Sequence, residues 1–112
     1  MSDPTPETVF CLYRVIPGRE KPLLDLLWQH DVTLLKLGLV TDVPMTVYRG
    51  SDERGRPFIV KFFEWRNAEA VEAAHQHPEV MVLWERMDAQ CEARDGRPNM
   101  EFPHVERVAF PA

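Results

Sequence analysis

The stretch that most constrains the fold runs from residue 57 to residue 78, PFIVKFFEWRNAEAVEAAHQHP. Its first nine residues are mostly β-branched or aromatic, which is typical of a strand. Side chains alternate along a strand, so one face carries Phe58, Val60 and Phe62 and the other carries Ile59, Phe63 and Trp65. Only Lys61 and Glu64 interrupt the apolar run. The sequence therefore predicts a strand that is covered on both faces.

A helix is predicted to follow this strand, because the apolar period changes at Asn67. Asn is a favoured N-cap residue, and Glu69 lies in the first turn, where the helix dipole favours an acidic side chain. Pro78 cannot continue this helix without losing a hydrogen bond, so we expect a break at Gln76-His77. A second helical segment, residues 78–93, then carries an apolar stripe at helical spacing.

The remaining segments complete a β-α-β-β-α-β order. Residues 8–16 form a predicted strand, residues 19–37 a helix with a leucine stripe, residues 45–49 a strand before a polar hairpin turn, and residues 100–108 a short edge strand. This order predicts a ferredoxin-like α+β fold, a four-stranded antiparallel sheet with both helices on one face. We expect one domain over residues 8–112, after a disordered N-terminal lead at residues 1–7.

Composition excludes several classes of partner. The net charge is −5 and the Lys and Arg residues are scattered, so nucleic acid is not expected to bind. No apolar run approaches the roughly 20 residues of a membrane span, and the N-terminus has no signal-peptide pattern. Cys11 and Cys91 are therefore expected to be reduced, buried thiols of a cytoplasmic protein.

A second copy of the chain is the expected partner. The two helices cover one face of the sheet, yet the other face still carries aromatic side chains. An exposed apolar patch of this kind marks an association site. We therefore expect a homodimer through the open sheet face, related by a two-fold axis.

His30 and His75 are the candidate catalytic residues. His30 lies in the middle of the leucine stripe, so it is either a pocket acid or base, or a core histidine bonded through both ring nitrogens. If it only packs, leucine at this position completes the stripe without loss of stability. His77, two positions from His75, points away from it on a helix and suits a helix end, so no metal site is expected; His104 stays unassigned.

Four further residues are candidate ligand contacts. Tyr13, Arg14 and Tyr48 are polar groups on predicted strands, where they can orient a ligand among apolar walls. Trp65 at the end of its strand either stacks on a flat ligand or packs in the core. The sequence contains no nucleophile elbow, phosphate loop or cysteine metal cluster, so neither covalent catalysis nor nucleotide binding is supported.

Three local pieces, FFEW at residues 62–65, Ala73-Ala74-His75 and His77-Pro78, give the chain a family resemblance. With the element order, they resemble the dimeric α/β-barrel superfamily, especially the antibiotic biosynthesis monooxygenase domain. The resemblance implies a dimer with a small-molecule pocket between sheet and helices in each subunit. Activities in this superfamily range from the oxidation of polycyclic phenols by O₂ without a cofactor to the degradation of haem.

The haem-degrading branch matches the chain only in part. Its members place a Trp at the end of the third strand and a haem-ligating His ten residues later, a spacing that Trp65 and His75 share. The branch also carries an Asn on the first strand, where this chain has Tyr13. Haem is therefore not favoured, and we expect no cofactor.

The function that the resemblance implies is a cofactor-free monooxygenase acting on a small aromatic or polyketide-like molecule. His30 or His75 then deprotonates a phenolic substrate, whose carbanion gives an electron to O₂, while Trp65, Tyr13 and Arg14 hold the ring. The alternative is a non-catalytic dimer, a ligand-binding or structural protein whose histidines only pack.

Overall fold

The strand at the centre of the sequence pattern, β3 (Pro57–Trp65), pairs on both sides in a computed structural model that describes residues 5–111. Its neighbours are β1 (Glu7–Tyr13) and β2 (Thr46–Ser51), and both pairings are antiparallel. The strand order β2-β3-β1-β4 is that of a ferredoxin-like sheet, which confirms the predicted fold class. Dimerisation into a barrel stays a prediction.

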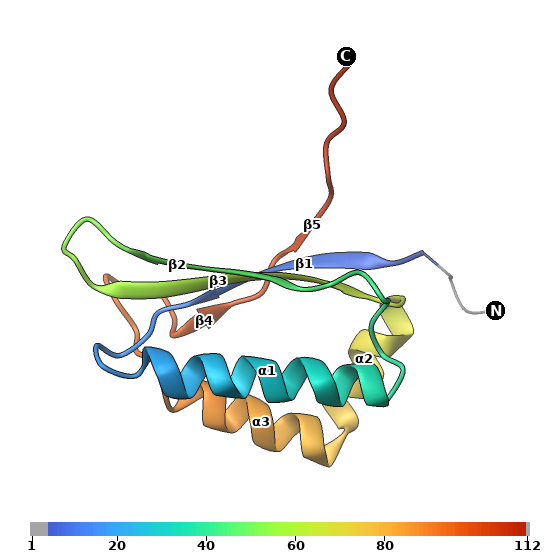
Figure 1. Cartoon of the computed structure of the whole chain (residues 1–112), viewed down its shortest axis with the longest axis horizontal. Coiled ribbons are helices and arrows are strands. Elements are labelled where there is room, and N and C mark those ends of the chain that lie inside the picture. The colour runs from blue at the N-terminus through green and yellow to red at the C-terminus, as the bar shows by residue number, and fades with distance from the viewer. Residues whose placement is uncertain (1–4, 112) are drawn as a thin grey trace.

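The last predicted strand is divided in two. Strands β4 (Met100–Glu101) and β5 (His104–Val105) both pair with β1, and Phe102 and Pro103 lie between them. Proline has no N–H for a ladder, and here it contributes its carbonyl instead, which accepts a hydrogen bond from the Phe10 N–H at 2.9 Å. The chain beyond β5 runs away from the sheet on the side opposite the helices (Figure 1).

Three helices, α1 (Glu20–Lys36), α2 (Ala68–Gln76) and α3 (Pro78–Asp88), lie on one side of the sheet (Figure 1). The predicted break is confirmed, because α2 ends at Gln76 and α3 begins at Pro78. The Asn67 side chain caps α2 by accepting a hydrogen bond from the Ala70 N–H at 2.8 Å.

The two faces of the sheet differ in what lies against them. The helix side carries buried side chains from alternate positions of β1 and β3: Val9, Cys11, Tyr13, Ile59, Lys61, Phe63 and Trp65. The other positions form the open face, which we define as Phe10, Leu12, Phe58, Val60 and Phe62, all half-buried. No helix of the described residues covers the open face (Figure 1).

The N-terminal lead predicted at residues 1–7 lies partly outside the described residues, and strand β1 begins at Glu7. Within residues 5–111, no helix combines the length and the apolar character that crossing a membrane requires.

Candidate functional site

A cavity of about 150 Å³ lies between the sheet and the helices. Side chains of strands, helices and the C-terminal segment line it: Val9, Cys11, Tyr13, His30, Phe63, Trp65, Val71, His75, Trp84, Phe102 and His104. Four of the six predicted site residues are in this set: His30, His75, Tyr13 and Trp65. Chain segments far apart in the sequence therefore bring these four candidates together, although their roles stay predictions.

The cavity has a closed floor and an open mouth. Tyr13, His30 and Trp65 at the floor are at most 4% exposed, whereas His75, Phe102 and His104 are exposed. An apolar cavity of this volume accepts one benzene-sized molecule. The space therefore fits a single aromatic ring, with the rest of a larger ligand outside the mouth.

His30 is held through both ring nitrogens. The Trp84 indole N–H donates to His30 Nε2 at 2.9 Å, and Lys61 Nζ lies 3.2 Å from His30 Nδ1. Burial holds the pKa of His30 well below its usual range, so the ring is neutral. His30 is thus a core histidine bonded through both ring nitrogens, as one of the two alternatives predicts, and it also lines the cavity. Its role as an acid or base stays a prediction.

His75 presents a free ring nitrogen at the mouth. Its Nδ1 donates to the Val71 carbonyl oxygen at 2.7 Å, because a carbonyl can only accept. In the neutral ring, Nε2 then carries the lone pair and has no hydrogen-bond partner among the described residues. The His75 ring also packs against Trp84, with their ring centroids 4.8 Å apart. His75 is therefore the histidine best arranged to accept a proton directly.

Tyr13 and Cys11 supply protonated groups at the floor. Burial raises the pKa of the Cys11 thiol to about 11 and raises that of the Tyr13 hydroxyl well above its usual range. Both groups keep their protons near neutral pH, so each can donate a hydrogen bond to a ligand oxygen. Neither is a nucleophile or a base there.

Lys61 is the residue that sequence reasoning missed. Its side chain is 1% exposed and lies over the Phe63 ring, with Nζ 4.6 Å from the ring centroid. The signal was present, because Lys61 alternates in phase with Ile59 and Phe63 and therefore faces the helices. A lone lysine on an inward-facing row needs a buried partner, and His30 provides it.

Arg14 and Tyr48 do not join the other four candidates, because they lie on the opposite side of the sheet from the cavity. A role for them in ligand binding stays a prediction. The Arg14 guanidinium donates to the Pro98 carbonyl oxygen and to Glu101 Oε2, both at 2.6 Å. The Tyr48 side chain is 61% exposed on β2. A ligand in the cavity does not contact either residue. Alternation alone did not reveal which face of each strand the helices cover.

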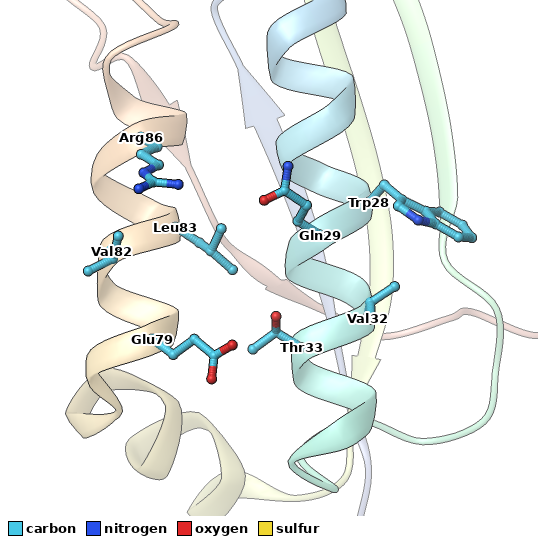
Figure 2. A pocket seen from close by; sticks show the side chains of 8 residues that line it. All are labelled: Trp28, Gln29, Val32, Thr33, Glu79, Val82, Leu83 and Arg86. Atoms are coloured by element: carbon cyan, nitrogen blue, oxygen red, sulfur yellow. The ribbon is translucent and has the colours of Figure 1, made fainter.

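A larger hollow of about 510 Å³ lies in the groove between α1 and α3 (Figure 2). Trp28 and Val32 in its wall are 63% and 47% exposed, so the groove is open to solvent. Its charged groups are Glu79 and Arg86, and no histidine lines it. Volume alone favours this groove, but the buried titratable groups converge on the smaller cavity, which we take as the candidate site.

The cavity residues do not fit a haem. Small-molecule sites usually hold roughly 300–1,000 Å³, and this cavity of about 150 Å³ is smaller than the lower limit for drug-sized ligands. Trp84 also packs directly against His75, the residue whose spacing matched a haem ligand. Among the described residues, no group of three or more His, Cys, Asp or Glu side chains is placed to hold a metal ion.

Known structures share this fold at low sequence identity. A variant of SnoaB, a cofactor-independent oxygenase from Streptomyces nogalater, is 13% identical with a TM-score of 0.69, and the match covers 96% of this chain and 98% of that one. A dimeric ferredoxin-like protein of unknown function from Jannaschia sp. CCS1 is 16% identical with a TM-score of 0.65, covering 92% and 100%. No protein-family model and no curated protein matches the sequence. These likenesses establish the fold, which a structure described as an antibiotic biosynthesis monooxygenase also shares at 14% identity and a TM-score of 0.65.

Proposed function

We propose that the chain binds a small hydroxyarene in the cavity and oxidises it with O₂ without a cofactor. The observation that carries this proposal is a ring-sized apolar space with one histidine at its floor, His30, and a second at its mouth, His75. The shared fold with a cofactor-independent oxygenase supports it. Because of the volume of the cavity, we expect the substrate to be a molecule that places one aromatic ring inside it.

The chemistry needs two proton acceptors, one at each end of the ring. Loss of the hydroxyl proton gives an anion whose electron density reaches the para carbon, which then gives an electron to O₂. The resulting radical pair forms a carbon–oxygen bond, and the peroxide takes up a proton. Loss of the para hydrogen as a proton, with departure of the distal oxygen as water, leaves a quinone. In total, the substrate loses two hydrogens and gains one oxygen atom.

Each cavity group has a role in this scheme. His75 Nε2 at the mouth accepts the proton from the para carbon, and Trp65 holds the ring plane by packing. The Tyr13 hydroxyl donates a hydrogen bond to the substrate oxygen at the floor, where negative charge develops. In the ligand-free protein, the His30 ring nitrogens contact Lys61 Nζ and the Trp84 indole N–H. His30 can act on a substrate only if the substrate replaces one of these two partners.

We also propose that the protein is a homodimer through the open face and that it works in the cytoplasm. The aromatic pair Phe10 and Phe62, with ring centroids 5.3 Å apart, lies on that face. A structural neighbour described as dimeric supports this arrangement.

The test is oxygen uptake with α-naphthol in buffer that is free of metals and flavins. We expect naphthoquinone and water as products, and the His75→Gln variant is expected to lose roughly 10²–10⁴-fold in kcat. His77→Gln is the matched control, because His77 does not line the cavity. Ligand binding without oxygen uptake in the wild-type protein contradicts an oxygenase and supports the non-catalytic alternative.

A further inference from the structure

The hydrogen bonds around His30 permit one arrangement of protons. The Trp84 indole nitrogen can only donate, so His30 Nε2 must accept from it. A neutral imidazole has one donor and one acceptor, and Nδ1 therefore carries the proton. That N–H points at Lys61 Nζ, 3.2 Å away, which can accept it only through the lone pair of an uncharged amine.

The alternative arrangements place two donors against each other. If Lys61 is an ammonium ion that donates to Nδ1, then Nε2 carries the ring proton and faces the indole N–H at 2.9 Å. A doubly protonated His30 has the same conflict with Trp84. The contacts therefore select a neutral histidine beside a neutral lysine.

We propose that Lys61 is the proton store of the cavity, by which we mean the group that takes up the proton of a bound ligand through His30. Weakly acidic hydroxyarenes therefore bind in the cavity as anions. This inference rests on the proposed function for its ligand class. The ligand hydroxyl replaces the Trp84 indole at His30 Nε2 and gives its proton to that nitrogen. The Nδ1 proton of His30 moves at the same time to Lys61 Nζ, which becomes an ammonium ion. No proton leaves the protein, and His30 returns to a neutral ring.

The surroundings of Lys61 suit both of its charge states. Burial lowers the pKa of Lys61, which favours the amine in the ligand-free protein. The titratable groups that face it are Cys11 from β1 and Asp31 and His30 from α1. The Asp31 carboxylate and the Phe63 ring both favour the cation once it forms, and the ligand anion adds to them. Lys61 is thus a positioning residue that touches His30 rather than the substrate.

The first experiment follows isotope-labelled lysine by NMR in the ligand-free protein. The chain has three lysines, and exposed Lys21 and Lys36 serve as internal references for Lys61. We expect Lys61 to show the shifts of a neutral amine near neutral pH, whereas the other two are ammonium ions. In Trp84→Phe the indole donor is gone, so His30 Nε2 can carry the ring proton and Nδ1 can accept a hydrogen bond from Lys61 as an ammonium ion. The pKa of Lys61 should therefore rise. A wild-type Lys61 that is an ammonium ion near neutral pH overturns the proposal.

The second experiment uses para-nitrophenol at a pH well below its solution pKa, where the free probe is the neutral phenol. We expect the bound probe to show the phenolate absorption band, and calorimetry in different buffers to detect no released proton. Lys61→Met should lose that band, and Lys36→Met, a change at an exposed lysine, should keep it. A probe that binds as the neutral phenol, or that does not bind, contradicts the proton store.

The two proposals fail in distinguishable ways. Neither experiment on Lys61 requires turnover. An absence of oxygen uptake with α-naphthol therefore contradicts the oxygenase but leaves the expected NMR shifts and the phenolate band unchanged.

Discussion

The two faces of the sheet differ in where they place polar groups and large aromatic side chains. The face covered by helices buries the polar group of Lys61 and the hydroxyl of Tyr13, whereas the open face presents Phe10, Phe58 and Phe62. A protein whose only task is to fold as a monomer has no reason for this arrangement, because buried polar groups cost free energy and exposed apolar patches promote association. The comparison supports our proposals of chemistry on the covered face and of a partner on the open face.

The largest difference between the two faces is expected when a lysine replaces either of two adjacent residues, Phe62 on the open face or Phe63 on the covered face. Phe62→Lys on the open face is expected to leave a folded monomer in sedimentation experiments, because an ammonium ion at the interface has no partner. Phe63→Lys should instead unfold the protein, since Phe63 is 7% exposed and Lys61 Nζ already lies over its ring. A wild-type protein that sediments as a monomer contradicts the role given to the open face. Equal effects of the two variants contradict the difference between the faces.

The His30→Leu variant tests how much the covered face depends on its hydrogen bonds. The leucine stripe alone predicts that this change keeps stability, but the structure reverses that expectation. Leucine leaves the Trp84 indole N–H and the Lys61 amine without partners, and an unsatisfied buried group costs about 1–3 kcal/mol. We expect a net decrease in the free energy of unfolding, measured by urea titration with Leu34→Met as the control for a neutral core change. A His30→Leu variant as stable as the wild-type protein contradicts a stabilising role for the hydrogen bonds of His30 with Trp84 and Lys61.

The pH dependence of stability gives a smaller effect with a defined sign. His30 has a normal pKa of about 6.5 when unfolded and a lowered pKa when folded. Below about pH 6.5, the unfolded state takes up a proton that the folded state refuses, so the free energy of unfolding falls as the pH falls. Urea titrations across this range should show a shallower dependence in His30→Leu. An identical slope in the two proteins contradicts a neutral, buried His30.

The sequence allowed the local features to be predicted because they depend on near neighbours. The Asn67 cap, the break before Pro78 and the alternation along β3 each follow from a few adjacent residues. The site was harder because its contacts are distant in sequence. His30 meets Lys61 31 residues away and Trp84 54 residues away. The spacing of apolar residues along one helix or strand does not predict contacts between residues so far apart in the sequence.

The positions of Arg14 and Tyr48 away from the cavity have the same physical origin. Both are polar residues on strands, but the face that a strand presents to the helices depends on the register of the whole sheet. Lys61 interrupts an apolar run in the sequence, yet its phase with Ile59 places it on the inward row. The sequence shows which side chains share a face of a strand. It does not show which of the two faces the helices cover.

One measurement tests most directly whether the cavity on the covered face is the binding site. The three tryptophan indole N–H groups give separate NMR signals, and Trp65 and Trp84 line the cavity while Trp28 lies in the outer groove between α1 and α3. On titration with para-nitrophenol, we expect the Trp65 and Trp84 signals to move together with one affinity and the Trp28 signal to stay in place. Movement of Trp28 alone would assign the ligand to the outer groove and contradict the account.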